Sequence, residues 1–529
     1  MVTRIVAQQT ASSTRSKLVP SVAPVARRAG QAAQQAARAV QKNVSDAASG
    51  MLGLSGERMS KVDTAWLRMD SPSNLMMIVG VWTLQPGIAY EALCARVQER
   101  LLQYSRFRQR VVEDAAGATW VEDGDFDLRR HVVREQLANK PRSDQQQALQ
   151  DRAAELAMQP LDPKRPLWQF HLVEDYLGAD GQKGSALIMR IHHCIADGIA
   201  LISVILSLVD GGAPPPERRR RQAPEGPQDW IADALIKPFT GITVKALGAA
   251  GEGAAKSLEM LRDPSKGMNS SLEMAKLAYQ AVSDATALAL MPDDSPTRLK
   301  GKPGTAKRLA WCQPIPLDEV KAVGKALNAS VNDVLLSCVA GAIGEYLKSL
   351  GDDVAGQEIR AMVPVNLRPM DQAYQLGNRF GLVPLVLPIG MGNPIERLYE
   401  VRRRMGQLKG SLQPLLAFGM LAVAGLLIKP AQEALLKLFG RKTTAVMTNV
   451  PGPREKLKLC GATLEQCMFW VPQSGDIGLG VSILSYGGGV QFGVITDSTL
   501  CPDPQKIIDE FEPEFAKLSI VTLMLPWGE

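Results

Sequence analysis

Histidine is scarce in this 529-residue chain, which contains only four, and cysteine is nearly as rare, with seven. The odd number of cysteines and the lack of a Cys-x-x-Cys pair argue against a disulfide framework and a zinc site, and they fit a reducing cytosol. Two of the four histidines are adjacent in one motif, so a histidine-rich metal site is not expected either.

A glycine-rich phosphate motif ahead of a helix is also missing, so nucleotide binding of the P-loop or Rossmann kind has no support. The net charge of +6 is modest and does not indicate a nucleic-acid surface. No segment reaches the roughly 18–20 apolar residues that a membrane-spanning helix requires. The longest apolar run, Pro414–Ile428, has two interpretations, a core helix or a helix that dips into a membrane.

The chain does have enough apolar material, 46%, for two cores rather than one. Residues 57–210 alternate strand-like and helix-like segments, and residues 305–529 form a second alternating region. Between them, residues 211–304 are predicted to be a linker and helical crossover that includes the exposed Pro/Arg run Pro214–Arg221. Residues 1–56 form a basic, Ala/Gln-rich flexible arm, whose composition suits a transit peptide or an arm that touches anionic lipid.

The most informative segment of the chain is IHHCIADG, at Ile191–Gly198. A short buried strand is predicted over Ser185–Ile191, and an apolar helix is predicted over Gly198–Val209. A histidine between a strand and a tight turn is held rigidly and can still face a cleft. Its neutral ring accepts a proton near physiological pH, so the segment indicates that His193 is a general base.

The two histidines are not expected to share a function, because side chains alternate along a strand. His193 falls on the face of Leu187, Met189 and Ile191, whereas His192 falls on the opposite face. Asp197 stands where the helix begins, so one interpretation of this residue is an N-cap. Cys194 is adjacent to the proposed base, but it falls on the other strand face and is rejected as a covalent nucleophile.

The motif is similar to the HHxxxDG signature of acyltransferases with the fold of coenzyme A-dependent acyltransferases, a group that includes the condensation domains of peptide synthetases. Further blocks in matching order narrow this choice: Met59–Val81, Pro160–Trp168, Ser330–Leu336, Thr448–Pro453 and Ser485–Asp497. Over roughly residues 57–515 the chain resembles the bacterial wax ester synthase/diacylglycerol acyltransferase family.

This resemblance implies an α/β fold of two chloramphenicol-acetyltransferase-like halves, joined by a long helical crossover, with a catalytic channel at their interface. It implies an O-acyltransferase that moves a long-chain acyl group from acyl-CoA to diacylglycerol or a long-chain alcohol, forming triacylglycerol and wax esters for storage. Acyl-CoA is then a substrate, and no cofactor, metal or nucleic acid is expected. The expected location is the cytoplasm, with peripheral contact to the anionic inner membrane or to lipid droplets.

The resemblance also implies roles for individual residues of the motif. His193 is the general base, while His192 shapes the site. Asp197 turns away from the base and supports the loop, in agreement with the N-cap interpretation, and Gly198 allows the tight turn. Asn332 is expected in the first turn of a helix after a Ser330–Asp333 capping box, where it either supports the oxyanion or only opens the helix.

Five residues outside the histidine motif are candidates for substrate binding, by lining the channel rather than reacting: Arg165, Pro166, Trp168, Asn449 and Ser474. Two other functions stay open. One is a condensation-type acyltransferase that takes its acyl group from a carrier protein. The other is a catalytically idle protein of the same fold that binds lipid droplets, against which the intact His193 and Asp197 argue.

Overall fold

A computed structural model describes residues 56–114, 117–137, 144–178, 181–212, 291–367, 376–408 and 440–524, with isolated positions 413, 414, 417 and 432. The chain divides into a small unit, Met1–Ser55 with Asp114–Ala116, and a large unit that holds the remainder. The predictions for the arm, for most of the crossover and for most of Pro414–Ile428 lie outside the described residues.

One sheet is built mainly from the N-terminal half of the chain, in the strand order β13-β14-β2-β7-β6-β5. Only β5 and β6 run parallel, and the other neighbours for which a register is described are antiparallel. Its strands are β2 (Met77–Gln85), β5 (Val132–Glu135), β6 (Trp168–Leu177), β7 (Lys183–His192), β13 (Lys458–Leu459) and β14 (Ala462–Trp470). The helices of this half are α2 (Lys61–Arg68), α3 (Tyr90–Arg100), α4 (Gln145–Ala157) and α5 (Gly198–Leu208).

Three shorter strands form a separate small sheet in the order β1-β4-β3. They are β1 (Glu57–Arg58), β3 (Gln109–Asp114) and β4 (Gly117–Glu122).

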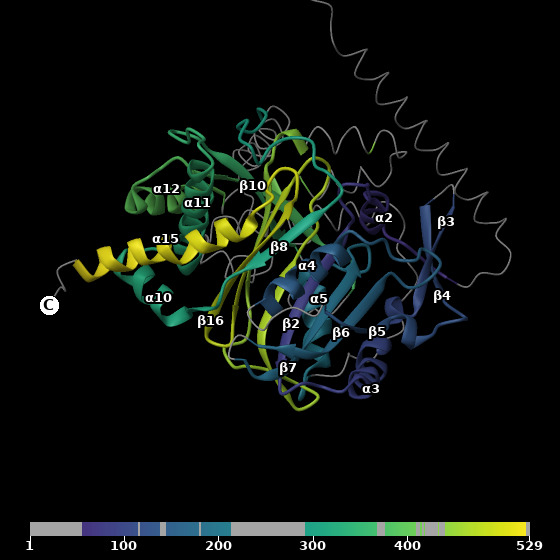
Figure 1. Ribbon diagram of the computed structural model, residues 1–529. Coiled ribbons are helices and arrows are strands. Elements are labelled where there is room, and N and C mark those ends of the chain that lie inside the picture. The colour runs from purple at the N-terminus through teal and green to yellow at the C-terminus, as the bar shows by residue number, and fades with distance from the viewer. Residues whose placement is uncertain are drawn as a thin grey trace, which may run out of the picture. The chain divides into compact units, whose positions relative to one another are not determined.

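A second large sheet belongs to the C-terminal half and has the order β11-β10-β12-β15-β16-β8, with β9 also pairing with β16. Its strands are β8 (Lys307–Trp311), β9 (Ile315–Pro316), β10 (Ile359–Asn366), β11 (Phe380–Leu387), β12 (Ala445–Pro451), β15 (Leu479–Tyr486) and β16 (Gly489–Asp497). Four helices gather on one face of this sheet: α10 (Leu317–Ala326), α11 (Val331–Ser349), α12 (Pro394–Leu408) and α15 (Pro504–Met524) (Figure 1).

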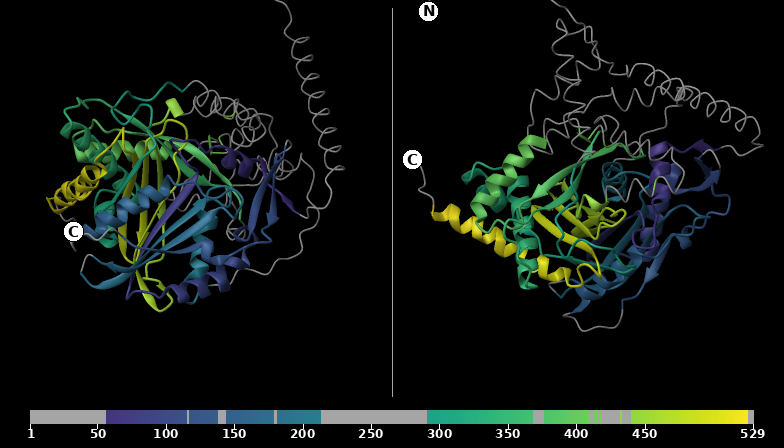
Figure 2. Two further views of the ribbon diagram at one scale, coloured as in Figure 1. Left: turned by 45° about the vertical axis from the view of Figure 1, so that its right-hand side comes forward. Right: turned by 90° about the horizontal axis from the view of Figure 1, so that it is seen from above.

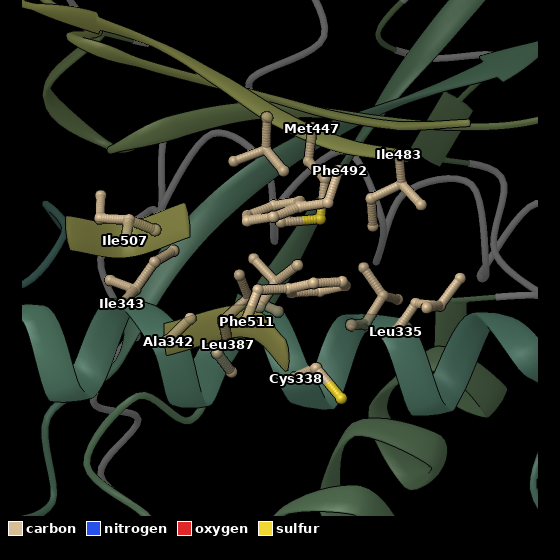
Figure 3. Packing of buried hydrophobic residues seen from close by; sticks show 14 of the residues in the cluster. Leu335, Cys338, Ala342, Ile343, Leu387, Met447, Ile483, Phe492, Ile507 and Phe511 are labelled. Atoms are coloured by element: carbon tan, nitrogen blue, oxygen red, sulfur yellow. The ribbon is translucent and has the colours of Figure 1, made fainter. Parts of the chain in front are cut away.

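The core of the C-terminal half lies between this sheet and helices α11 and α15. Phe492 on β16 stacks on Phe511 of α15, with ring centroids 4.1 Å apart, and Leu335 and Ile343 of α11 belong to the same cluster (Figure 3). Helix α11 begins with a capping box in which Ser330 and Asp333 satisfy each other's backbone N–H groups, as the sequence predicted. Helix α11 also contributes many fully buried residues to the core. Its position is therefore fixed by packing along its length and by the capping box at its start.

The C-terminal half contributes strands to the sheet of the N-terminal half. Strand β14 comes late in the chain, yet it pairs with β2 of the N-terminal sheet, and Figure 1 shows this yellow-green strand beside the purple β2. Trp470 of β14 also lies 5.8 Å from Trp311 of β8, ring to ring. The prediction of two α/β halves is confirmed. The sequence boundaries at 210 and 305 stay a prediction, because the described parts of both halves belong to one unit.

Strand β7 is buried along almost its whole length, and its side chains separate into two clusters. Leu187, Met189 and Ile191 pack with Trp66 in one cluster, while Ile188 packs with α4 in another. This is the alternation that the sequence predicted for the strand before His193. Among the described helices none spans a membrane by itself, although α10 and α11 together are long and apolar enough, with a bend of 98° between them.

A substitution at Gly341 of α11 tests how tightly the helices of the C-terminal half are packed. A Cβ at this position would overlap Glu514 Oε2 and lie 2.6 Å from Arg397 Nη2, and these two side chains form an ion pair that is almost fully buried. Gly341→Ala should therefore separate a buried pair and lower the free energy of unfolding by about 3 kcal/mol or more. Denaturant unfolding measures this change.

Gly406→Ala is the matched control, because Gly406 is exposed on α12 and a Cβ there meets no described atom within 4 Å. It should be neutral or should stabilise the protein by about 0.5–1 kcal/mol. Equal unfolding free energies for the two alanine variants would contradict this account of the packing.

Candidate active site

The two histidines mark the point where β7 ends and the chain turns into α5. Strand β7 ends at His192, and α5 begins at Gly198 after its N-cap residue Asp197. The backbone N–H of His193 donates to Met76 O at 2.7 Å, which ties the turn to the loop before β2. His193 is thus fixed at its backbone on both sides, by a central strand and by a capped helix.

The ring of His193 is buried between aromatic side chains from the two halves of the chain. It stacks on Trp66 of α2, with centroids 4.2 Å apart and planes at 19°. Phe380, the first residue of β11, lies 5.5 Å away and is tilted. His193 as a whole residue is only 3% exposed, so water has little access to its ring. The site is therefore built where the N-terminal and C-terminal halves meet.

The charge state of His193 follows from this environment. Burial lowers the pKa of the His193 ring to about 4, although the negative charge of Asp197, the carbonyl group of His193 itself and the Asn378 side chain oppose the shift. The ring is consequently neutral at physiological pH, which is the form that accepts a proton. Its Nδ1 atom is buried and has no hydrogen-bond partner within the described part of the chain.

A short loop of the C-terminal half, Gly377–Arg379, closes over the histidine turn. Asn378 Nδ2 donates to His193 O at 2.8 Å and to Asp63 Oδ1 at 2.8 Å, and the backbone N–H of Asn378 donates to Asp63 Oδ1 at 3.0 Å. Arg106 Nη1 donates both to Asp63 Oδ2, at 3.2 Å, and to Ile195 O, at 3.1 Å. The buried Asp63 thus joins α2, the histidine turn and this loop.

Sequence reasoning did not assign functions to Trp66, Asp63, Arg106, Asn378 or Phe380. Trp66 and Asp63 lie in the opening block Met59–Val81, whose sequence indicates a family resemblance but no role for either residue. A buried acidic residue in an amphipathic helix was the available local signal, because such a residue needs a partner. For Asn378 no local signal existed, since its contacts with Asp63 span 315 positions of sequence.

Asp197 engages both of its carboxylate oxygens with backbone N–H groups. Oδ1 accepts from Ala200 N at 3.0 Å and caps α5, while Oδ2 accepts from Arg379 N at 2.8 Å. The N-cap interpretation is confirmed by this geometry. Gly198 needs a correction, because its backbone is not in the left-handed region and a Cβ there would meet no described atom within 4 Å. The tight turn therefore does not require glycine at this position.

His192 has partners of its own and is turned away from the site of His193. Its Nδ1 accepts from Cys194 N at 3.2 Å, and its Nε2 lies 3.3 Å from Asp70 Oδ1. Because Cys194 N and Asp70 engage both of its nitrogens, the ring has no free nitrogen lone pair for a substrate proton. His192 therefore fits the predicted supporting role and not that of a second base.

Asn332 and Asn449, predicted separately, are in direct contact. Asn449 Nδ2, on β12, donates to Asn332 Oδ1 in the first turn of α11 at 2.5 Å. None of the hydrogen bonds or ring contacts described for His193 involves either residue. Ser474 lies in the loop between β14 and β15, where its carbonyl accepts from Ile477 N at 3.3 Å.

The residues of the Pro160–Trp168 block occupy structural positions. Arg165 donates to Asp123 Oδ2 at 3.2 Å and to Asp125 Oδ2 at 2.6 Å, so it holds a loop of the N-terminal half. The Pro166 carbonyl accepts from Trp168 N at 2.9 Å. The Trp168 ring is buried in the core, and its Nε1 donates to Phe107 O at 2.8 Å. A substrate contact for these residues stays a prediction.

Among the described residues, no group of three or more His, Cys, Asp or Glu side chains could hold a metal ion. The site itself presents a neutral buried imidazole with aromatic walls and the Asn378 amide beside it. An imidazole of this kind takes a proton from a hydroxyl as that hydroxyl attacks an acyl carbon.

Two protein-family models match the chain. The wax ester synthase/diacylglycerol acyltransferase catalytic domain matches residues 59–335, and the WS/DGAT C-terminal domain matches residues 376–519. A probable diacylglycerol O-acyltransferase of Mycobacterium tuberculosis is 26% identical over 475 residues, which cover 88% of this chain and 96% of that protein.

Solved structures share the fold at lower identity. The wax ester synthase/diacylglycerol acyltransferase from Marinobacter aquaeolei superposes with a TM-score of 0.59 at 20% identity, covering 88% of this chain and 99% of that one. The first condensation domain of the calcium-dependent antibiotic synthetase gives 0.52 at 12% identity, covering 88% and 96%.

The fold is that of two-half acyltransferases, and the matching catalytic-domain model shows that the protein is an acyltransferase. Within that class, the chain belongs to the wax ester synthase/diacylglycerol acyltransferase family, whose two domain models together cover most of its length.

The charge state of His193 predicts the pH dependence of turnover. Since burial lowers the pKa of this ring to about 4, the base stays neutral from pH 8 down to about pH 5. Its activity is lost only as the pH falls through about 4, not through the ordinary histidine value of about 6.5. We expect a flat profile of kcat/KM over this range. Far-UV circular dichroism on the same samples separates protonation from acid unfolding, and an inflection near pH 6.5 without unfolding would contradict the assignment.

Proposed function

We propose that this enzyme transfers a long-chain acyl group from acyl-CoA to diacylglycerol and to long-chain alcohols, forming triacylglycerol and wax esters. The observation that carries the proposal is the neutral His193 ring, buried between Trp66 and Phe380 where the two halves meet. Both family domains and the mycobacterial relative support the choice of substrates.

In the proposed reaction His193 takes the proton of the acceptor hydroxyl while its oxygen attacks the thioester carbon. The tetrahedral intermediate then expels the coenzyme A thiolate, which takes the proton back from the imidazolium. The charged ring exists only between these steps. The negative charge of Asp197 and the face of the Trp66 ring favour the imidazolium, in opposition to burial.

Asn332 is the proposed support for the oxyanion. Its Oδ1 accepts from Asn449 Nδ2, which orients the Asn332 amide so that its own Nδ2 remains a donor. One such donor typically contributes about 10²–10³ in rate. The other interpretation, that Asn332 only opens α11, predicts a loss of stability instead of a loss of kcat when it is replaced.

Direct contact with a lipid surface is the second part of the proposal, at the inner membrane or at droplets in the cytoplasm. Along most of α15 the outward positions are polar, as at Lys506, Asp509 and Glu512. At its end the outward residues become apolar, with Ile520 57%, Leu523 65% and Met524 80% exposed. Figure 2 shows this end of α15 extending away from the C-terminal sheet. Apolar side chains in such a position are suited to insertion among acyl chains.

The condensation-type alternative differs in its acyl donor and is favoured only by the shared fold. It predicts turnover with an acyl carrier protein and little turnover with acyl-CoA. Thin-layer chromatography of the products from acyl-CoA, with diacylglycerol or a fatty alcohol as acceptor, separates the two functions and also tests the idle lipid-binding alternative.

Replacing His193 tests the proposed base. His193→Ala should lower kcat by about 10²–10⁴, the usual contribution of a general base, with an unchanged far-UV spectrum. Asp197→Ala is the matched control for a structural role. It removes the cap of α5 and a partner of Arg379 N, so it should cost about 1–2 kcal/mol of stability along with activity. A His193→Ala enzyme that keeps more than a tenth of the rate would rule out this base.

The acceptor series tests whether the site selects alcohols by the apolar surface they bury. Each buried methylene is worth about 0.8 kcal/mol, so kcat/KM should rise along a series of linear alcohols until the space for the chain is filled. Water should be a poor acceptor because it gains no such energy. A flat series, or hydrolysis as fast as acyl transfer, would be incompatible with the proposal.

The exposed apolar residues at the end of α15 are the expected contact with lipid, and their replacement tests this expectation. Replacing Ile520, Leu523 and Met524 together by serine should weaken binding to phospholipid vesicles at least tenfold, because each side chain loses a buried apolar surface. Tyr399→Ser, at another exposed apolar residue on α12, is the control and should bind normally. Sedimentation with vesicles gives the measurement, and equal binding of all three proteins would exclude α15 as the contact.

A further inference from the structure

The side-chain amide of Asn378 has an orientation that its partners determine. Its Nδ2 donates to two acceptors, Asp63 Oδ1 and His193 O, each at 2.8 Å. Neither of these oxygens can donate, so the nitrogen must lie on that side of the amide. The Asn378 oxygen, Oδ1, is consequently directed to the remaining side.

Two buried polar atoms are left without a hydrogen-bond partner at this place in the described structure: Asn378 Oδ1 and His193 Nδ1. They belong to residues that are already joined through Asn378 Nδ2 and His193 O. An amide oxygen is an acceptor, and a ring nitrogen that carries a proton is a donor, so the two atoms are complementary. The Asn378 side chain also raises the pKa of His193, against the larger effect of burial, as an acceptor close to the ring does.

Besides Asn378, the nearest acceptor for the ring is the carbonyl oxygen of His193 itself, which also raises the pKa of the ring but already accepts from Asn378 Nδ2 at 2.8 Å. Trp66 and Phe380 present aromatic faces. The carboxylate oxygens of Asp197 each accept a backbone N–H, from Ala200 and from Arg379. An unsatisfied buried donor costs about 1–3 kcal/mol, which is enough to select the ring tautomer whose proton has a partner.

We propose that Asn378 is a positioning residue whose Oδ1 accepts a hydrogen bond from His193 Nδ1–H. This bond holds the neutral ring in the tautomer that leaves Nε2 without a proton, and Nε2 then takes the proton of the acceptor hydroxyl. The proposal rests on the proposed role of His193 as the base. Because Asn378 comes from the C-terminal half and His193 from the N-terminal half, the base acquires its tautomer only when the two halves are assembled.

The tautomer is directly measurable, because the chain has only four histidines. In the full-length protein labelled with ring-¹⁵N histidine, at pH 7.5, the spectrum contains four ring systems, and His193→Gln identifies the one that belongs to His193. We expect a protonated Nδ1 and a bare Nε2 for His193. In Asn378→Ala we expect the proton to shift towards Nε2, together with a 10–100-fold lower kcat, as is typical for loss of a supporting partner, and with KM for acyl-CoA unchanged.

Asp63→Asn is the matched control, because it changes the same buried cluster without removing the Asn378 amide from the ring. It should leave the His193 tautomer unchanged even where it lowers stability. Asn378→Ser replaces the alanine variant if that protein does not fold, since serine retains a hydroxyl near Asp63 but is too short to reach the ring.

Two results would overturn the proposal: a wild-type His193 protonated at Nε2, or a tautomer that is the same with and without the Asn378 amide. Failure of the proposed base is a different result, namely a His193→Gln protein that remains active. We expect the tautomer to shift in Asn378→Ala but not in Asp63→Asn, and we expect His193→Gln to be inactive. These results together support the role of Asn378 as a positioning residue and the role of His193 as the base.

Discussion

The structure depends on one buried polar cluster, in which Asp63 holds the loop Gly377–Arg379 against the histidine turn. A carboxylate that is 1% exposed is tolerable only when charged and neutral donors surround it, and here Arg106 and Asn378 supply them. The same loop reaches Asp197 through the N–H of Arg379. The geometry of the histidine turn is therefore set by contacts between the two halves, and neither half builds the candidate site alone.

Burial of the histidine explains both what the site does and what it avoids. Aromatic walls remove water from the ring, which keeps it neutral and ready to accept a proton. In the proposed mechanism the same walls keep water from competing with an alcohol. The same burial makes the charged imidazolium costly to form, because this ion must arise between the aromatic walls without water around it. Asp197 and Trp66 reduce that difficulty without contributing a proton, so the proposed mechanism needs only one titrating group.

Local features of the chain were predictable from its sequence, and features that join distant segments were not. The strand before His193, the helix after Asp197 and the capping box at Ser330 follow from alternation and capping chemistry, which act over a few residues. The pairing of β14 with β2 escaped prediction, as did the contact of Asn378 with Asp63, because each is decided by tertiary packing across hundreds of residues. Gly198 shows the opposite error, where a motif residue was given a backbone role that its conformation does not require.

The central claim is that His193 activates the acceptor directly, so no acyl group becomes attached to the protein. Intact-protein mass spectrometry after rapid mixing with acyl-CoA in the absence of an acceptor tests this claim most directly. We predict an unmodified mass and no release of coenzyme A until an alcohol is added. A stoichiometric acyl adduct that disappears on addition of alcohol, carried by Cys194 or any other nucleophile, would contradict the account.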